Sequence, residues 1–458
     1  MKLTVLGGGG VRAPLLAKSI CSRAVELGIT QVVFMDNNEE KLAMFGGLAR
    51  EVARADAPSV AFELTSDPIL ALRDTDAVIA TLRVGDAQGR VLDETVPLSM
   101  GLLGQETTGA GGFAMAMRSI PALLDYCELI KDIAKPGVRV FNFTNPSGLV
   151  TQTLHDAGYG FVIGICDGPS EFIKELERLT DTPAGGLCVE CCGLNHFSWY
   201  PSVCRDGVEL LPDLLWDEKL FQDTEMRLFD PELTRSLGAL CNGYLYYYYH
   251  REQALHNIKK EGITRGRVIL DINRRMEEEL HGVDIQKDFK KAMQIYLEYY
   301  CERENSYMTI ESASARGNCE QVGAITDYRE IDNNGYAGVA LNILSALRGG
   351  EGRRMVLSVP NCGVIAGLKD TDIIETSCMV NQNGITPVRM GVMPEFQLIQ
   401  MQQMKLYERL ASAAIREHSI EKACMALTIH PLVSSYSLSK RLMKEFLSAH
   451  KAYVGTWS

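Results

Sequence analysis

The stretch KLTVLGGGG, residues 2–10, decides the fold prediction, because an apolar run that leads into glycines is typical of a buried parallel strand and its turn. Residues 13–28, APLLAKSICSRAVELG, carry apolar side chains at helical spacing and end on Gly28, which suits a helix C-cap. The next apolar run, QVVFMD (31–36), indicates a second strand that ends at Asp36. Strand, helix and strand in this order predict a doubly wound α/β sheet.

The glycine turn predicts a dinucleotide site. Gly7 and Gly9 fit the first two glycines of the G-x-G-x-x-G fingerprint, whereas Arg12 stands in place of the third. Asp36 follows Gly7 by 29 residues, and an acid at the end of the second strand suits a ribose hydroxyl pair and would repel the 2′-phosphate of NADP. We therefore expect NAD+, although a strand-to-helix turn without a ligand is the alternative. The residues expected to bind NAD+ are Gly7, Gly9, Gly10, Val11, Asp36 and Thr81.

The rest of the chain predicts two domains. TDAVIATL (75–82) and VRVFNFTNPSG (138–148) indicate further strands with loops at their carboxyl ends. The second half mixes long helical patterns with short strands, as in an α+β domain. We expect a Rossmann-like, doubly wound NAD-binding domain over residues 1–165. An α+β domain over residues 166–458 is expected to carry the catalytic, metal and substrate sites and the oligomer contacts.

Composition and charge argue against several classes of partner. The chain has 458 residues, 46% hydrophobic and 23% charged, which is ordinary for a globular protein. Its formal net charge of −12 disfavours nucleic acid and anionic membrane surfaces as partners. No apolar run approaches the roughly 20 residues of a membrane span, and the start MKLTVLGGGG is too short for a signal peptide. We expect a cytoplasmic protein whose 13 scattered cysteines are reduced thiols.

A cysteine and a histidine are candidate metal ligands. In GICDGP, residues 164–169, Cys166 follows a short apolar strand and stands beside Asp167, and His196 comes 30 residues after the cysteine. A thiolate and an imidazole that meet in space would form a two-ligand site with positions left open for substrate oxygens. Alternatively each is structural, since free cysteine is among the most buried residues. CVECC (188–192) lacks a second ligand pair and indicates a strand with buried thiols.

Two segments of the first half carry polar side chains suited to a ligand. GLLGQETTGAGGF, residues 101–113, is interpreted as a close-approach loop that presents Gln105, Glu106 and Thr107, and a flexible loop is the alternative. Asn145 lies at the carboxyl end of a predicted strand, where open sheets bind ligands, although an Asn-Pro turn would also explain it.

Tyrosines and arginines mark the middle of the chain. CNGYLYYYYH, residues 241–250, has an aromatic stripe of the kind that usually packs in a core, and Tyr244 is the tyrosine most set apart. EGITRGR, residues 261–267, places Arg265 and Arg267 just before a helical pattern, where two arginines suit a phosphate. A solvated basic turn is the alternative.

Taken together these motifs resemble glycoside hydrolase family 4, the NAD-dependent glycosidases. The resemblance rests on LGGGG with Asp36, and on LLGQETTGAGGF, FNFTNPSG, GICDGP, GLNHFSW and YLYYYY, which follow one another in family order. It implies a C-terminal domain similar to that of lactate dehydrogenase and the family 4 glycosidases, and a homodimer or homotetramer.

The resemblance also implies redox elimination in place of two-carboxylate hydrolysis. NAD+ would take hydride from sugar carbon 3, and the resulting ketone would acidify the proton on carbon 2, for which Tyr244 matches the family's base. A divalent ion, usually Mn2+, held by Cys166 and His196, would stabilise the enediolate while the sugar's 2- and 3-hydroxyls fill its open positions. The aglycone would then leave, water would add, and NADH would return the hydride.

The implied substrate is a small phosphorylated glycoside. The loop GQETTGAGGF resembles the 6-phospho-β-glucosidases, so we expect a preference for β-linked 6-phosphoglucosides. Asp167 matches an acid that in the family goes with α-linked 6-phosphoglucosides, where it protonates the leaving oxygen, so a 6-phospho-α-glucosidase, a mixed-anomer enzyme or a non-phosphorylated substrate are alternatives. A conventional NAD-dependent sugar dehydrogenase is a more distant alternative function. The expected substrate contacts are Arg83, Arg90, Glu106, Asn145, Asn195, Arg265 and Arg267, the last two at the 6-phosphate.

Overall fold

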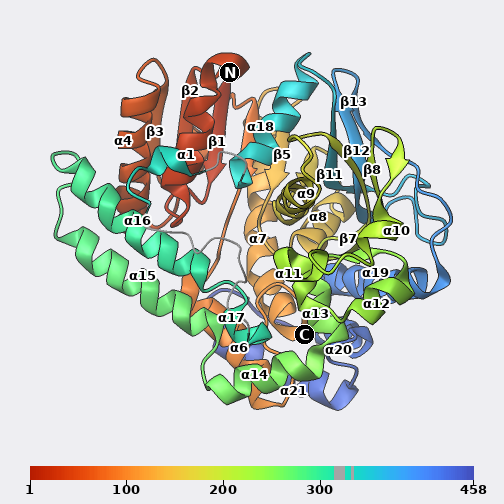
Figure 1. The fold of residues 1–458 in the computed structure, drawn as a ribbon. Coiled ribbons are helices and arrows are strands. Elements are labelled where there is room, and N and C mark those ends of the chain that lie inside the picture. The colour runs from red at the N-terminus through yellow and green to blue at the C-terminus, as the bar shows by residue number, and fades with distance from the viewer. Residues whose placement is uncertain (314–324, 332–334) are drawn as a thin grey trace.

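The protein is described here by a computed structural model, which covers residues 1–313, 325–331 and 335–458 (Figure 1). Within these residues thirteen strands form one sheet in the order β10-β8-β7-β12-β11-β6-β5-β4-β1-β2-β3, with β13 paired to β12 and β9 to β8. The strands are β1 (Lys2–Leu6), β2 (Gln31–Met35), β3 (Ala61–Thr65), β4 (Ala77–Ala80), β5 (Arg139–Asn142), β6 (Val162–Gly164), β7 (Leu187–Leu194), β8 (Phe197–Arg205), β9 (Val208–Glu209), β10 (Leu240–Cys241), β11 (Arg353–Pro360), β12 (Ile373–Asn381) and β13 (Gly384–Pro387).

Helices cover both faces of this sheet. In the first half they alternate with the strands, and later they form longer runs, among which α15 and α16 lie together at one side (Figure 1). The helices are α1 (Ala13–Ser22), α2 (Ala24–Leu27), α3 (Glu39–Lys41), α4 (Gly47–Asp56), α5 (Pro68–Leu72), α6 (Asp86–Ser99), α7 (Gly109–Ile133), α8 (Ser147–Asp156), α9 (Gly168–Leu179), α10 (Leu211–Leu214), α11 (Leu220–Asp223), α12 (Pro231–Leu237), α13 (Tyr246–Tyr249), α14 (Arg251–Glu261), α15 (Arg265–His281), α16 (Phe289–Asn305), α17 (Thr309–Ser312), α18 (Tyr336–Leu347), α19 (Glu395–Glu417), α20 (Ile420–Ile429) and α21 (Tyr436–Ala449).

The N-terminal half of the sheet confirms the predicted doubly wound fold. Strands β3, β2, β1, β4, β5 and β6 are all parallel and follow one another in that order. The order reverses between β1 and β4, so the loops that leave these two strands diverge and open a crevice at their carboxyl ends. The helix predicted over residues 13–28 is broken at Arg23 into α1 and α2, and Gly28 caps it in the left-handed conformation, with φ +61°.

The hydrophobic core lies in two layers, one on each face of the sheet. Successive side chains of a strand point to opposite faces, so Val32 and Phe34 of β2 pack with α1, α4, α16 and α18. Their neighbours Val33 and Met35 pack in the other layer with α7, α8 and α19. The near-continuous apolar strands of the sequence are thus buried on both faces, as expected for parallel strands in an α/β protein.

The antiparallel half of the sheet continues directly from the parallel half. Ser358 of β11 pairs with Gly164 of β6, and β12, β7 and β8 follow in antiparallel order. The boundary expected at 165/166 therefore falls in the loop after β6, while the sheet itself runs across it. The division into domains 1–165 and 166–458 stays a prediction.

Three smaller expectations can be compared with the structure. CVECC lies in β7 with Cys191 and Cys192 buried, although Cys188 is exposed. Every cysteine in the described part of the chain is free. The tyrosine-rich stretch forms a short turn, Gly243–Leu245, followed by the single-turn helix α13. Among the residues described, no helix has the length and apolar character needed to cross a membrane.

Candidate active site

A cavity of about 400 Å³ opens at the point where the strand order reverses. Its walls come from the ends of β1, β2 and β4, the loop after β5, and helices α6, α7, α15 and α16. All six residues expected to bind NAD+ line it, together with three of the expected substrate contacts. These nine residues are Gly7, Gly9, Gly10, Val11, Asp36, Thr81, Arg83, Arg90 and Asn145.

The turn after β1 is shaped by contacts that exclude side chains. Gly7 has φ +92°, and a Cβ on it would lie 2.6 Å from the carbonyl oxygen of Thr81. A Cβ on Gly9 would lie 3.0 Å from the carboxylate of Asp36, whose Oδ2 accepts a hydrogen bond from the Gly9 N–H at 2.9 Å. Burial raises the pKa of Asp36 above its ordinary value. The bare backbone beside this carboxylate fits the pyrophosphate and ribose of a dinucleotide.

In the glycine-rich segment after α6, residues 103–108 form a buried loop and α7 begins at Gly109, which favours the close-approach interpretation over a flexible loop. The Oε1 atom of Gln105 accepts hydrogen bonds from the N–H groups of Thr107 and Thr108, at 2.6 and 3.0 Å. A Cβ on Gly104 would lie 1.9 Å from the carbonyl oxygen of Glu94, so the loop packs against α6 through bare backbone. This packing fixes Glu106 at the edge of the cavity.

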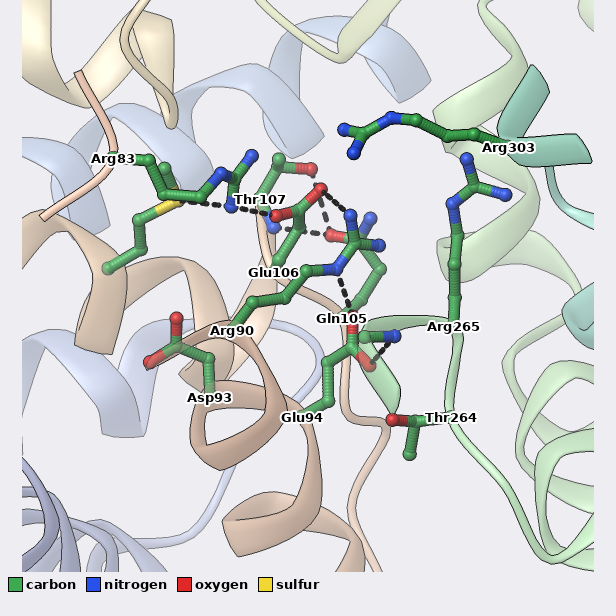
Figure 2. Close-up of polar contacts among 12 residues, drawn as sticks. Arg83, Arg90, Asp93, Glu94, Gln105, Glu106, Thr107, Thr264, Arg265 and Arg303 are labelled. Carbon is green, nitrogen blue, oxygen red and sulfur yellow. Dashed lines mark hydrogen bonds and ion pairs between the residues drawn. The ribbon is translucent and has the colours of Figure 1, made fainter. Parts of the chain in front are cut away.

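Glu106 joins two arginines of the cavity wall (Figure 2). It forms ion pairs with Arg83 and, at 2.7 Å, with Arg90, and Arg90 also donates to Glu94 at 2.8 Å. Burial alone would raise the pKa of Glu106, but the charges of Arg83 and Arg90 outweigh it and lower the pKa to about 2. The carboxylate is therefore ionised at neutral pH and holds both guanidinium groups in place.

Acid should weaken the fold through Glu106. Its folded pKa of about 2 lies below its ordinary value of 4.5, so its stabilising effect is complete above pH 4.5 and is lost as the pH falls towards 2. Glu106→Gln should lower the free energy of unfolding at pH 7 by on the order of 3 kcal/mol, because the half-buried Arg83 loses its ion pair with Glu106 and the buried Arg90 keeps only Glu94. Urea unfolding at pH 7 and pH 3 measures this. Equal losses at both pH values would contradict the assignment, and the exposed Glu128→Gln is the control.

The arginine cluster includes one residue that the sequence motifs missed. Arg303 of α16 lines the cavity, donates to Asn273 at 3.2 Å, and has a pKa lowered to about 10 by burial and by neighbouring arginines, Arg12 first among them. Arg265, at the start of α15, lies near it, over the ring of Tyr307 at 4.9 Å (Figure 2). Arg83, Arg90, Arg265 and Arg303 thus lie around Glu94 and Glu106 (Figure 2), and the charge of the buried Glu311 also acts on Arg90.

Arg267 is one of four expected substrate contacts that do not line the cavity, the others being Glu106, Asn195 and Arg265. Arg267 is exposed. Residues two apart on a helix point to nearly opposite sides, so Arg265 and Arg267 of α15 cannot both face the cluster. Gly266 between them packs against α6, where its N–H donates to Glu94 at 2.6 Å. Arg265 lies beside Arg303 (Figure 2) while Arg267 is exposed, and the role of both arginines in binding the substrate stays a prediction.

Cys166 and His196 meet as the two-ligand interpretation requires. Cys166 follows β6, His196 lies in the tight turn between β7 and β8, and Sγ and Nε2 are 3.7 Å apart. Burial lowers the pKa of His196 to about 4 and raises that of Cys166, so the imidazole is neutral. Zinc–sulfur and zinc–nitrogen bonds of about 2.3 and 2.1 Å show the scale at which one ion can bridge such a separation.

The donor set suits an open metal site. In the described part of the chain no three His, Cys, Asp or Glu residues gather closely enough to hold an ion. Further ligands at Cys166 and His196 would have to be water or substrate oxygens, which is the arrangement of a catalytic rather than a structural site. The residues present therefore fit a divalent ion that binds substrate.

Tyr244 stacks on the imidazole of His196. The ring centroids are 3.8 Å apart and the planes differ by 6°. Burial raises the pKa of Tyr244 to about 12, while hydrogen bonds with Tyr307 and Thr107 act in the opposite direction. Thr107 adjoins Glu106, so this phenol lies beside the arginine cluster. Tyr307, like Arg303, belongs to no motif that sequence reasoning could recognise.

The remaining expected residues surround this centre. Asp167 occupies the N-cap position of α9 next to Cys166, without a side-chain capping hydrogen bond, and burial raises its pKa. Asn195 adjoins His196 and donates to Glu375 of β12 at 2.9 Å. Asn145 lines the cavity after β5. Cys166, His196 and Tyr244 do not themselves line the cavity. They are connected to its wall through Glu106, whose charge acts on His196 and Tyr244 and which pairs with Arg83 and Arg90.

Two family models match the sequence along most of its length. The family described as Family 4 glycosyl hydrolase matches residues 2–182, and Family 4 glycosyl hydrolase C-terminal domain matches residues 191–433. The chain belongs to family 4 of the glycosyl hydrolases.

This family 4 glycosyl hydrolase is similar to glucosidases of two kinds. It is 27% identical to 6-phospho-beta-glucosidase BglT of Thermotoga maritima, over 99% of both chains. It is 26% identical to maltose-6'-phosphate glucosidase MalH of Clostridium acetobutylicum, over 98% of both chains. A solved structure of the T. maritima 6-phospho-beta glucosidase with manganese, NAD+ and glucose-6-phosphate aligns with a TM-score of 0.82 at 26% identity, over 99% of both chains.

Proposed function

We propose that this enzyme hydrolyses 6-phosphoglucosides by NAD+- and metal-dependent redox elimination. A thiol, a neutral imidazole and a phenol meet beside a dinucleotide cavity, and the stack of Tyr244 on His196 is the observation that carries the proposal. NAD+ would supply a hydride acceptor for sugar carbon 3, and a divalent ion such as Mn2+ would supply positive charge beside the sugar hydroxyls. The solved T. maritima relative holds these groups with glucose-6-phosphate, which supports this reading.

Tyr244 is proposed as the base that removes the proton on carbon 2. Its phenol is protonated in the structure, because burial raises its pKa to about 12. A divalent ion held by Cys166 and the adjacent neutral imidazole would lower that value, and the hydrogen bonds with Tyr307 and Thr107 favour the ionised form. Asp167, next to Cys166, is placed to protonate a leaving oxygen, since burial raises its pKa.

The arginine cluster is proposed to hold the sugar and its 6-phosphate. Arg83 and Arg90 are held by Glu106. Asn145, which lines the cavity, and Asn195 are proposed to contact the sugar hydroxyls. Arg265 and Arg303 add positive charge beyond what Glu94 and Glu106 neutralise. Guanidinium groups bind phosphate well because they present paired donors. We assign the phosphate to Arg265 and Arg303, with Arg303 replacing Arg267.

The glycosidic bond of the substrate can be β-linked or α-linked. The loop around Glu106 favours the β-linked substrate, whereas the buried Asp167 with its raised pKa favours the α-linked one, as in maltose 6′-phosphate. Similarity to BglT and to MalH is nearly equal, at 27% and 26%. We propose β-linked 6-phosphoglucosides as preferred substrates, with α-linked ones as the second candidate.

Cleavage of four aryl glucosides tests the function. They are the α and β anomers, each with and without a 6-phosphate, assayed with Mn2+ and NAD+ and then with each omitted. We expect cleavage of the phosphorylated pair only, a faster β rate, dependence on both Mn2+ and NAD+, and no net NADH. Accumulation of NADH without cleavage would instead identify a sugar dehydrogenase. Cleavage without NAD+ would exclude redox elimination.

Location and assembly follow as part of the same proposal. A sugar phosphorylated on import would reach its glucosidase in the cytoplasm, so we propose a cytoplasmic enzyme. A homodimer or homotetramer is proposed from the family resemblance, and light scattering of the purified protein would measure it.

A further inference from the structure

We propose that Glu375 is a positioning residue whose single carboxylate aligns His196 with Tyr244. This inference rests on the roles proposed above for His196 and Tyr244. Glu375 lies on β12, which pairs with β7, and only 2% of its surface is exposed. It belongs to no motif of the sequence and does not line the cavity.

One branch of contacts leads from Glu375 to the turn that carries His196. The Glu375 Oε1 atom accepts a hydrogen bond from Asn195 at 2.9 Å, and Oε2 accepts one from Ser198 at 2.9 Å. The carboxylate therefore binds the turn on both sides of His196. His196 has φ +61°, a left-handed conformation that is unfavourable for a residue with a Cβ. A strained turn of this kind needs anchoring from outside, and the two hydrogen bonds provide it.

A second branch leads from the same carboxylate to Tyr244. Ser198 Oγ accepts from Asn242 Nδ2 at 3.4 Å, and the Asn242 N–H donates to the Ser198 carbonyl at 3.0 Å. Asn242 Oδ1 in turn accepts from the N–H of Tyr244 at 3.0 Å. Both rings of the 3.8 Å stack are therefore connected to Glu375 by short chains of hydrogen bonds.

The charge of Glu375 also points to a role beyond packing. In the described part of the chain its hydrogen-bond donors are neutral and it takes part in no ion pair. Burial raises its pKa to about 7, and its charge is felt at Cys166. A buried carboxylate without a cation is costly, and a cation at Cys166 and His196 would compensate it. Carboxylates behind metal-binding histidines commonly tune metal affinity in this way.

Two variants separate the branches. Glu375→Gln keeps the shape of the side chain but removes its charge. It also places an amide N–H donor opposite the Ser198 hydroxyl, where the carboxylate oxygen had accepted a hydrogen bond. Mn2+ affinity should therefore fall by about 10- to 100-fold. Ser198→Ala leaves the bond between Glu375 and Asn195 and the backbone bond from Asn242 to the Ser198 carbonyl. It removes the hydroxyl through which the carboxylate reaches the Asn242 side chain, and with it the side-chain part of the branch to Tyr244. It should keep Mn2+ affinity within about 2-fold, lower kcat by about 10-fold or more, and raise the isotope effect of deuterium at sugar carbon 2. Glu177→Gln is the control, because Glu177 is also buried and its carboxylate accepts from the Gly185 N–H at 2.6 Å, in the loop before β7.

Mn2+ binding is measured by electron paramagnetic resonance of the free ion with NAD+-saturated holoprotein, and NAD+ affinity by fluorescence. NAD+ affinity should be unchanged in all three variants. Unchanged Mn2+ affinity in a folded Glu375→Gln protein would overturn the role of Glu375, as would equal losses in Glu177→Gln. If Glu375→Gln does not fold, an unchanged carbon-2 isotope effect in Ser198→Ala would overturn it. Mn2+ affinity that is insensitive to Cys166→Ser would overturn the proposed function itself.

Discussion

Replacing Cys166 with Ser should abolish glycoside cleavage while leaving NAD+ binding intact. The thiol lies 3.7 Å from His196 Nε2, and a hydroxyl is a far poorer ligand for a divalent ion than a thiolate. The loss in kcat should exceed about 100-fold, more than a change in a residue that only supports a ligand. The cofactor turn around Gly7 and Asp36 is built from other strands and should be unaffected.

Turnover, Mn2+ affinity and NAD+ affinity are measured side by side for this variant. Cys204→Ser is the matched control, because Cys204 is also partly buried but lies on β8 away from the site. The control should keep wild-type turnover. Retention of metal-dependent turnover by Cys166→Ser would remove the cysteine from the metal site.

Tyr244→Phe should lower kcat by about 10²- to 10⁴-fold, the usual contribution of a general base. Phenylalanine keeps the ring that stacks on His196, so Mn2+ and NAD+ affinity should stay near wild type. Exchange of the carbon-2 proton with D2O, followed by NMR, should fall by a similar factor, because the phenol oxygen is what accepts that proton.

The control for this experiment is Tyr249→Phe. Tyr249 belongs to the same tyrosine run, but its hydroxyl donates to Gln400 at 2.9 Å, remote from the stack. Its variant should cleave at the wild-type rate. Normal carbon-2 exchange in Tyr244→Phe would assign the base to another group, and the neighbouring Tyr307 would be the first to test.

Local sequence signals were enough to predict the nucleotide half of the site. A strand, a glycine turn and an acid at the end of the next strand lie within the first 36 residues, and each has a steric or electrostatic reason visible in the structure, such as the contact between Gly9 and Asp36. The spacing of Cys166 and His196 in the sequence did not decide whether the two side chains meet in space. Their meeting depends on β7 joining the sheet beside β12, a pairing between strands far apart in the chain.

The features that sequence reasoning missed also have physical causes. The basic pair at Arg265 and Arg267 was read from charge without regard to helical period, which sends the two side chains to opposite sides. Arg303 stands in CERE, a charge run that looks like a solvated helix face. Glu375 sits in the strand IIETSCMVN, where nothing in the sequence distinguishes a buried acid from an edge residue. Such residues are identified only by their neighbours in space.

The pairing of β6 with β11 has a consequence for how the protein is made. Gly164 and Ser358 are 194 residues apart, so at 5–20 residues per second a ribosome needs about 10–40 s to supply the partner strand. During that interval the nascent nucleotide-binding half would present an open strand edge, the kind of surface that pairs wrongly with other chains. The sheet of this enzyme can therefore be completed only late in translation. Until then, chaperones that bind the exposed strand edge would protect the nascent chain from wrong pairing.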